Sequence, residues 1–356
     1  MLSVLGFHFR GPLGLAVIVV CLLWRTTPAS AQEARFFRIG AAATAGSFFE
    51  IGGVLASAIS KPAGSLPCEQ GGGCGVPGLV AVAQATQGSV ENLRMVASDQ
   101  IESGIAQSDI VSWAFAGTGI FADAGPIKKL RAIASLFPES LHVVVRGAGP
   151  VETLADLKGK RISLGQTGSG TLADARIVLG ASGLTEQDLS VENLRSGTAA
   201  AYLSDGSLEG FFLIGGVPIP AVRALAATTS IRLIPIPDAI LSKMQQHGAY
   251  DRSVISADTY PGVGNATSTV GFHALWVVSA DASDDLVFAI TKALWSEATQ
   301  RLLDAHDPIG KRVRLEHALD GLTIPLHPGA LRFYREAGLP VENIGSLANP
   351  IDTPKL

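Results

Sequence analysis

The sequence predicts an α/β fold. Short apolar segments of strand length alternate with amphipathic segments of helical period, which is the pattern of layered α/β domains. Hydrophobic residues make up 47% of the 356 residues and charged residues only 16%, so the chain can bury large cores. Glycine-rich loops join several predicted strands to the helices that follow them. The length is sufficient for two such domains.

The predicted elements follow from these patterns in chain order. In segment 47–59, Phe48, Ile51, Leu55 and Ile59 recur at helical spacing, which predicts an amphipathic helix. Further helices are predicted to open at Ser89 and near Thr171, and to occupy 199–203, most of 284–303 and 328–338. Strands are predicted at 36–42, 79–85, 108–114, 129–136, 141–146, 161–164, 210–214, 231–236 and 269–279.

Segment 161–180 carries the clearest indication of a ligand site. It is predicted as a buried strand, a glycine-rich loop from Gly165 to Gly170, and a helix. The first N–H groups of such a helix have no partner within it, and the helix dipole favours negative charge there. The spacing is that of a nucleotide-binding loop, but Thr171 stands where that loop needs a lysine. We therefore expect a carboxylate here, and not a triphosphate.

Two other junctions have the same character. Segments 44–47, 86–89 and 167–170 each place a small residue or a hydroxyl group where a predicted strand leads into a helix. In open α/β sheets, ligands bind against such junctions at the carboxyl ends of the strands. The three junctions predict one shared cleft; the alternative is that each is an ordinary helix N-cap.

The N-terminus has the features of a secretory signal peptide. Arg10 precedes an apolar run from Leu13 to Trp24, and Ala29-Ser30-Ala31 supplies the small residues of a cleavage site. We predict cleavage after Ala31, so that residues 1–31 are the signal peptide, and export to the periplasm. An uncleaved anchor is the alternative, although the run falls short of the ~20 residues that span a bilayer.

Two cysteines are expected to remain in the exported chain. Cys68 and Cys74 enclose a glycine-rich loop, and in an oxidising compartment we predict a disulfide between them. A metal site is the alternative, but two sulfur atoms without a nearby histidine make a poor zinc site. The six histidines outside the signal show no metal-binding spacing, so we expect neither a metal nor a cofactor. The net charge of −4, without a basic cluster, argues against nucleic acid as a partner.

Several longer segments resemble one known family. They are residues 39–53, 85–93, 107–109, 165–171 and 326–338. Together they resemble the TAXI family, the extracytoplasmic solute receptors of TRAP (tripartite ATP-independent periplasmic) transporters, in order and over nearly the whole mature chain. The resemblance implies a two-lobed type II periplasmic-binding-protein fold with a hinge and an interlobe ligand cleft.

The resemblance also implies a division of the chain and a function. Lobe 1 would comprise 32–141 plus 269–356, lobe 2 would comprise 142–268, and the strands at 141–146 and 269–278 would be the hinge crossings. A monomeric receptor would capture a small anionic solute, a carboxylate or an amino acid such as glutamate or a dicarboxylate. It would then deliver this solute to a TRAP-type membrane permease.

The ligand contacts implied by the resemblance come from both predicted lobes. They are Thr44, Gly46, Ser47, Phe48, Phe49, Ser89, Asn92, Gln107, Ser108, Asp109, Thr167, Gly168, Ser169, Gly170, Thr171, Gly216 and Pro218. The sequence departs from the family at Phe48-Phe49, which replaces a typical tyrosine pair and cannot donate a hydrogen bond. The positive partner of the anion stays open among Arg131, Arg146, Arg161 and Arg176.

Two other classes of function compete with a receptor. An exported hydrolase would need a nucleophile beside a base; the lipase-type Gly-x-Ser-x-Gly pattern is absent, and we expect Ser169 to bind a ligand and not to attack one. A sensor partner is the second alternative, because two-lobed binding proteins also serve signalling. We expect a protein that is not an enzyme.

Overall fold

The structure is a computed structural model that describes residues 34–70, 72–248, 250–306 and 308–341. The described residues form one compact unit. The predicted signal peptide, its cleavage site and the alternative of an uncleaved anchor lie outside the described residues. Within the described residues, no helix has both the length and the apolar character needed to cross a membrane.

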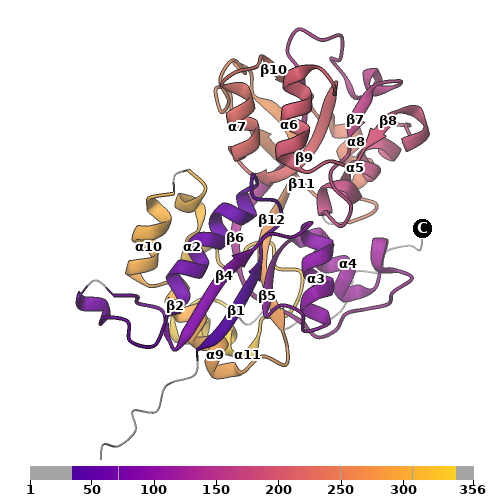
Figure 1. The fold of residues 1–356 in the computed structure, drawn as a ribbon. Coiled ribbons are helices and arrows are strands. Elements are labelled where there is room, and N and C mark those ends of the chain that lie inside the picture. The colour runs from indigo at the N-terminus through magenta and orange to yellow at the C-terminus, as the bar shows by residue number, and fades with distance from the viewer. Residues whose placement is uncertain (1–33, 71, 249, 307, 342–356) are drawn as a thin grey trace, which may run out of the picture. The chain divides into compact units, whose positions relative to one another are not determined.

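A ten-stranded sheet organises the described residues (Figure 1). Its strand order is β4-β1-β5-β12-β6-β9-β7-β8, with β10 paired to β6 and β11 paired to β12. The strands of this sheet are β1 (Arg35–Gly40), β4 (Leu79–Gln84), β5 (Ser103–Gln107), β6 (Leu130–Arg146), β7 (Arg161–Ser163), β8 (Ser190–Glu192), β9 (Gly210–Gly216), β10 (Ile231–Leu233), β11 (Asp251–Ile255) and β12 (Thr267–Ser279). A small second sheet pairs β2 (Ser60–Lys61) with β3 (Val76–Pro77).

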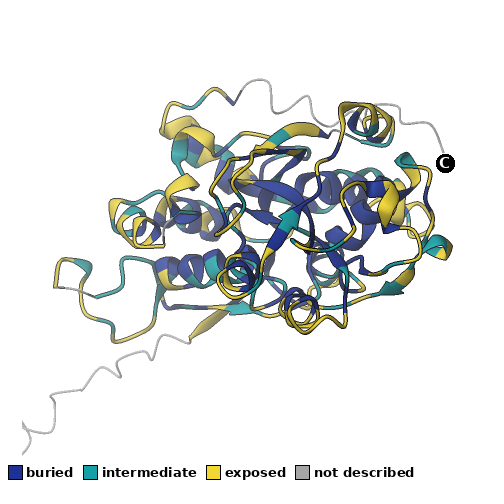
Figure 2. Cartoon of the chain, turned by 90° about the horizontal axis from the view of Figure 1, so that it is seen from above, coloured by how far each residue is buried: buried dark blue, intermediate teal, exposed yellow. Residues whose placement is uncertain are grey.

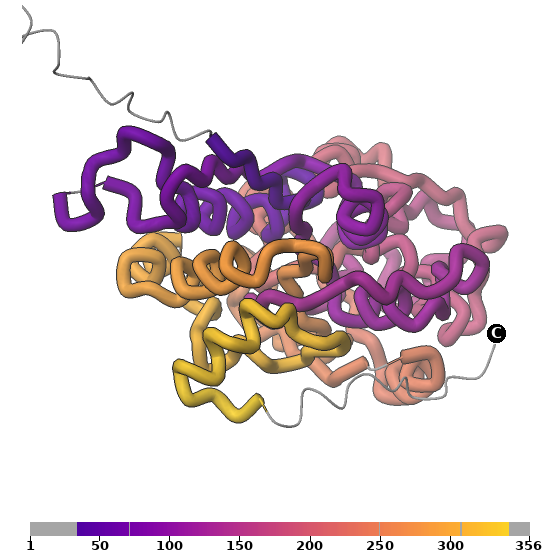
Figure 3. Tube along the Cα trace, turned by 90° about the horizontal axis from the view of Figure 1, so that it is seen from below, coloured from indigo at the N-terminus to yellow at the C-terminus, as the bar shows by residue number. Residues whose placement is uncertain are grey.

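Helices follow most of the strands. They are α2 (Ser47–Ile59), α3 (Ser89–Ala97), α4 (Ser108–Ala116), α5 (Gly170–Ala181), α6 (Ser196–Asp205), α7 (Pro220–Ala226), α8 (Asp238–Met244), α9 (Asp284–Leu294), α10 (Glu297–Asp304) and α11 (Pro328–Glu336). Figure 2 shows buried residues along the strands and the inner faces of the helices, and exposed residues on the outer turns. After β12 the chain returns to the side of the sheet on which α2 lies. Helices α9 and α10 both contact α2 (Figure 3). This alternation of strands and helices confirms the predicted α/β class.

Two long strands belong to both halves of the sheet. Strand β6 pairs with β12 at its beginning and with β9 from Glu139 to Val145. Strand β12 pairs with β11 at its beginning and with β5 from Ala274 to Val278. The rest of the sheet is thus divided into β4-β1-β5 on one side and β9-β7-β8 on the other, joined by two crossing strands. This is the strand plan of the predicted type II periplasmic-binding-protein fold, which is confirmed. The predicted lobe boundaries stay a prediction.

Three predicted strands were wrong in detail. Segment 108–114 is the helix α4, and the strand of this unit is β5, which ends at Gln107. Helix α4 is buried on most sides, so its apolar residues do not show the helical period from which a helix would be predicted. The predicted strands at 129–136 and 141–146 are one strand, β6. Pro138, which interrupts this pattern in the sequence, lies at an exposed position within β6.

The predicted disulfide is confirmed. Cys68 and Cys74 are bonded to each other in the loop between β2 and β3. Cys68 begins a single 3₁₀ turn, in which no residue is buried. The bond therefore joins the ends of a surface loop. Within the described residues, no group of acidic, histidine and cysteine side chains could hold a metal ion.

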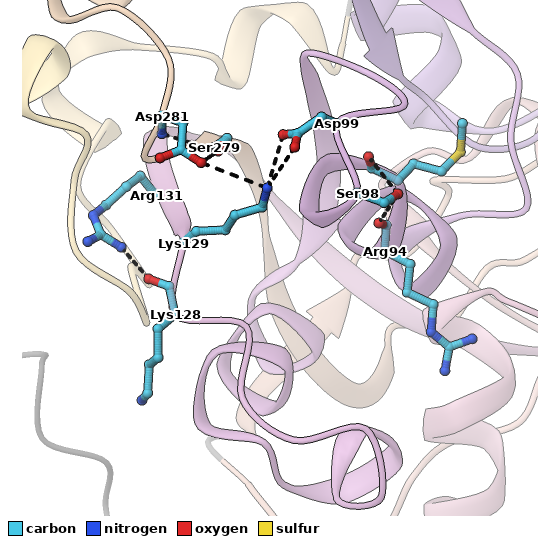
Figure 4. Close-up of polar contacts among 9 residues, drawn as sticks. Arg94, Ser98, Asp99, Lys128, Lys129, Arg131, Ser279 and Asp281 are labelled. Atoms are coloured by element: carbon cyan, nitrogen blue, oxygen red, sulfur yellow. Dashed lines mark hydrogen bonds and ion pairs between the residues drawn. The ribbon is translucent and has the colours of Figure 1, made fainter.

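An ion-pair cluster joins the start of β6 to two neighbouring segments (Figure 4). Lys129 Nζ lies 3.0 Å from a carboxylate oxygen of Asp99, which follows α3, and 3.8 Å from Asp281, which follows β12. The Asp99 and Asp281 side chains are 70% and 76% exposed. Exposed ion pairs of this kind contribute about 0–1 kcal/mol each, so the cluster positions a strand end and adds little to stability.

Candidate functional site

A cavity of about 70 Å³ lies where helices from both halves of the sheet begin. A water molecule needs roughly 10–15 Å³ of this kind of volume, so the cavity has room for about five waters or a compact ligand. Its lining residues are Ala42, Ala43, Gly46, Ser47, Phe48, Gln87, Gly88, Ser89, Gln107, Gly165, Gln166, Ser169, Gly170, Thr171, Leu194, Ser196, Ala199, Phe212, Leu213 and Ile214.

Five helices begin at this cavity. The lining includes the first residue or the N-cap of α2, α3, α4, α5 and α6, each of which has eight or more residues. The N-caps of α2 and α3 are Gly46 and Gly88, and neither has a side-chain hydrogen bond that would occupy the free N–H groups. The first N–H groups of a helix carry partial positive charge, so their convergence makes the cavity favourable for an anion.

In the described part of the chain, charged side chains do not contribute to the cavity wall. Among the described residues that line the cavity, no side chain is charged. The four arginines that the sequence left open contact other groups: Arg131 donates to Lys128 O, Arg146 to Leu203 O, Arg161 to Ser207 O, and Arg176 to Glu186. None of the four lines the cavity, so none of them is placed to be the partner of an anion there.

Two lining side chains have polar atoms without a partner among the described residues. They are Ser196 Oγ and Gln166 Oε1. The two residues are only 9% and 8% exposed. A buried polar atom left unpaired costs about 1–3 kcal/mol, so native structures rarely keep one without a use. Both atoms belong to the cavity wall, where a bound ligand would pair with them.

About half of the predicted contact residues meet at this cavity. They are Gly46, Ser47, Phe48, Ser89, Gln107, Ser169, Gly170 and Thr171. Gln166 and Ser196 were missed. Gln166 could have been found from its place in the glycine-rich loop, whereas Ser196 begins a helix that the sequence prediction started three residues too late.

The other predicted residues lie elsewhere. Thr44 is exposed, Thr167 and Gly168 line a separate surface depression with Arg94, and Phe49 lines another with Leu302. Ser108 begins α4, where its hydroxyl accepts a bond from His273 N, and Pro218 follows β9. Gly216 does not line the cavity, but it contacts a residue that does: its N–H donates to Ser47 Oγ at 3.0 Å.

Asn92 has a structural role. Its side-chain amide donates to Gly40 O at 3.0 Å and to Ile105 O at 2.8 Å, and its carbonyl oxygen accepts from Thr86 Oγ1. All of its polar atoms are thereby paired, and the residue is fully buried. Asn92 therefore ties α3 to β1 and β5 and positions the loop that begins α3.

Three hydroxyl groups at the cavity accept hydrogen bonds from backbone N–H groups of the protein. Ser169 Oγ accepts from Leu172 N at 3.1 Å, so Ser169 is the N-cap of α5. Thr171 Oγ1 accepts from Ile214 N at 3.2 Å, and Ser89 Oγ accepts from Gln107 N at 3.1 Å. The N-cap alternative is thus correct for Ser169. The hydroxyl hydrogens of Ser169 and Thr171 remain available to a ligand.

Hydrogen bonds across the cavity join its two sides. Gln107 Nε2, at the end of β5, donates to Asp174 Oδ2 of α5 at 2.9 Å. Gln166 Nε2 donates to Gln87 O, and Glu91 N donates to Gly168 O. The first bond joins the end of β5 to α5, and the other two hold segment 87–91 against the loop that precedes α5.

Three carboxyl groups are buried close to Gln107. Burial raises the pKa of Asp109 to about 6. Burial, together with the charge of Asp109, raises the pKa values of Asp174 and Glu139 well above the ordinary range. Each of the three residues is at most 2% exposed. Because charged carboxylates are costly in such surroundings, these groups hold protons at pH values where exposed carboxyl groups are ionised.

The fold is that of a type II periplasmic-binding protein, and its cavity is lined by the starts of helices together with uncharged polar and apolar side chains. A family model for the NMT1-like family matches residues 39–338, and the chain belongs to this family. The finer TAXI assignment is not part of this match.

Solved structures resemble the chain at low identity. The alkanesulfonate-binding protein SsuA from Xanthomonas axonopodis pv. citri, bound to MOPS, is 17% identical with a TM-score of 0.46, over 89% of this chain and 86% of that one. The periplasmic aliphatic sulphonate-binding protein SsuA from Escherichia coli is 14% identical with a TM-score of 0.42, over 90% and 93%. An ancestral arginine-binding protein bound to arginine is 14% identical with a TM-score of 0.45, over 79% and 99%.

Proposed function

We propose that this protein is an extracytoplasmic solute-binding receptor that holds a small anion in the cavity between two lobes. The lobes are 32–141 plus 269–356 and 142–268, with β6 and β12 as the hinge. The observation that carries the proposal is the convergence of five helix N-termini on a cavity that also contains the unpaired Ser196 Oγ and Gln166 Oε1.

The cavity wall suggests the kind of anion. One part of the wall consists of backbone N–H groups and small polar side chains, which suit a carboxylate or sulfonate group. The other part is apolar and includes Phe48, Phe212 and Leu194. We propose a compact organic anion whose charged group lies against the helix N-termini and whose remainder contacts these apolar side chains. Relatives in solved structures bind an alkanesulfonate or arginine according to their titles, so both chemistries belong in the test.

We further propose that the protein works in the periplasm, as a monomer, and delivers its solute to a membrane permease. The sequence resemblance to TAXI receptors supports a TRAP-type permease, which uses an ion gradient and no ATP. Uptake into vesicles that contain the purified permease tests this class. Uptake that follows the ion gradient supports it, and uptake that requires ATP contradicts it.

Binding is favoured over catalysis by the chemistry of the wall. Ser169, the nucleophile that a hydrolase would use, accepts a bond from Leu172 N. Among the described lining residues no histidine, aspartate or glutamate could act as its base. A hydrolase on this site would therefore lack the group that activates the nucleophile.

A thermal-shift screen tests the proposed function. We expect the midpoint of unfolding to rise with at least one small carboxylate, sulfonate or amino acid, because a ligand that binds only the folded state stabilises it. The neutral amide of each carboxylate is the matched control and should give no shift. Equal shifts with acids and amides, or hydrolysis of the amides, would contradict an anion receptor.

A further inference from the structure

The side-chain amide of Gln166 has only one orientation that its hydrogen bond allows. Its Nε2 donates to Gln87 O, in the loop before α3. A backbone carbonyl oxygen only accepts hydrogen bonds, so the nitrogen and not the oxygen of the amide must face it. Oε1 is therefore the other branch of the amide, and it has no partner among the described residues. Because Gln166 lines the cavity and is only 8% exposed, this oxygen is an acceptor that the fold leaves for a ligand.

Three hydroxyl groups of the cavity wall are free to donate. The oxygens of Ser47, Ser169 and Thr171 each accept a bond from a backbone N–H group. Their hydroxyl hydrogens have no acceptor in the described part of the chain, so each can donate to a ligand. Together with the N–H groups at the helix starts, these donors suit the oxygens of an anion. An anion that has only acceptor atoms would nevertheless leave Gln166 Oε1 unpaired.

The free acceptor belongs to the part of the wall where the anionic group is expected. Gln166 is in the loop before α5, and its backbone oxygen accepts from Ser169 N at 3.0 Å. Its side chain reaches the loop before α3 through Gln87 O. The starts of α3 and α5 are two of the N-termini that favour the anion, so the donor atom of the solute must lie close to its anionic group. In a small carboxylic acid, such a donor is a substituent on the carbon next to the carboxylate.

The wall suits a hydroxyl donor better than an ammonium group. An ammonium group is positively charged and brings three N–H donors, whereas the unpaired side-chain oxygens of the wall are those of Gln166 and Ser196. Among the described lining residues, none is an aspartate or glutamate that could balance the positive charge. Moving an unbalanced charge from water into such a site is far costlier than moving a hydroxyl group that finds an acceptor.

We propose that the solute is a small 2-hydroxycarboxylate, whose hydroxyl group donates to Gln166 Oε1 while its carboxylate lies against the helix N-termini. The inference rests on the proposed anion receptor and narrows its substrate class. Gln166 is then the residue that distinguishes a hydroxy acid from the parent acid without the hydroxyl group. The parent acid leaves this buried oxygen unpaired in the complex, so it binds about tenfold more weakly or worse.

Titration calorimetry of the purified protein with matched acids tests this assignment. Glycolate and lactate are compared with acetate and propionate, which lack the hydroxyl group, and with glycine and alanine, which carry an ammonium group in its place. We expect the hydroxy acids to bind about tenfold more tightly than either other set. Gln166→Met has a side chain of similar length without an amide, so hydroxy acids and parent acids should bind it with nearly equal affinity. Gln187→Met, at an exposed position, is the matched control and should keep the wild-type ratio of affinities.

The ratio of affinities separates recognition of the hydroxyl group from a structural role of Gln166. Gln166→Met also loses the bond to Gln87 O, and this loss weakens the binding of every anion alike without changing the ratio. A Gln166→Met variant that keeps the wild-type ratio would therefore overturn the assignment. If this variant fails to fold, the wild-type ratios alone decide.

The same titrations distinguish failure of the assignment from failure of the proposed function. Parent acids that bind the wild type as tightly as hydroxy acids, or amino acids that bind most tightly, would overturn the hydroxy-acid assignment and leave the receptor supported. No binding of glycolate or lactate would also overturn the assignment. If the thermal-shift screen is negative as well, the anion receptor itself is contradicted.

Discussion

Ser196→Asp is expected to abolish anion binding while the fold remains intact. Ser196 is the first residue of α6, lies in the cavity wall, and has a hydroxyl group without a partner among the described residues. An aspartate at the start of a helix is favourable by about 0.3–1 kcal/mol, so the free protein should be as stable as the wild type. A bound anion would then lie within a few ångströms of a second negative charge. At an effective dielectric constant of 20 this costs about 4 kcal/mol, which predicts a loss of affinity of at least a hundredfold.

Ser196→Asn is the matched control for this variant. It has the size of aspartate and can donate a hydrogen bond, but it is neutral. Titration calorimetry with an anion from the screen, and urea unfolding of all three proteins, separate charge from packing. An equal loss of affinity in the aspartate and asparagine variants would show that size and not charge decides binding, and unchanged affinity in the aspartate variant would contradict the placement of the anion.

Gly170→Ala is expected to weaken binding by about thirtyfold by preventing closure. A Cβ at this position would lie 1.9 Å from Gln107 Oε1 and 2.6 Å from its Cδ. Gln107 cannot move away easily, because its Nε2 is held by Asp174 and its backbone begins α4. Gly170 and Gln107 belong to different proposed lobes, so the clash arises only in the closed form. Overpacking of this kind costs about 1–3 kcal/mol, and the open protein should unfold at nearly the wild-type temperature.

Gly180→Ala, in the same helix, is the control. No atom lies within 4 Å of the added Cβ, and the residue is exposed. Replacing a helical glycine by alanine should stabilise the protein by about 0.5–1 kcal/mol and leave affinity unchanged. If Gly170→Ala lowers the unfolding temperature strongly but binds the ligand normally, then closure does not bring Gly170 against Gln107.

Helices and strands could be predicted from the sequence wherever their apolar residues recur with a helical or strand period. Helix α2 is amphipathic and was predicted with its observed bounds. Helix α4 was mistaken for a strand because burial on most sides removes the contrast between its faces. Strand β6 was divided in two because Pro138 is normally a strand breaker, and its exposed position within the strand depends on tertiary pairing that no local pattern encodes.

The site was predictable where it depends on backbone geometry. Gly46, Ser89 and Gly170 were found because a glycine or hydroxyl residue at a strand-to-helix junction marks the start of a helix. The pairing state of each side chain was not predictable. Asn92 was taken as a ligand contact, although its amide is fully used by Gly40 and Ile105, and Ser196 was overlooked although its hydroxyl is unpaired. These differences arise from contacts between residues far apart in the chain.

Anomalous diffraction from crystals soaked in bromide tests the central claim most directly, because a halide reports an anion site without knowledge of the solute. We expect a bromide peak inside the cavity, against the N–H groups at the starts of α2, α3 and α5, and its loss in crystals of Ser196→Asp. Bromide bound only at surface arginine and lysine side chains, with none in the cavity, would contradict the account.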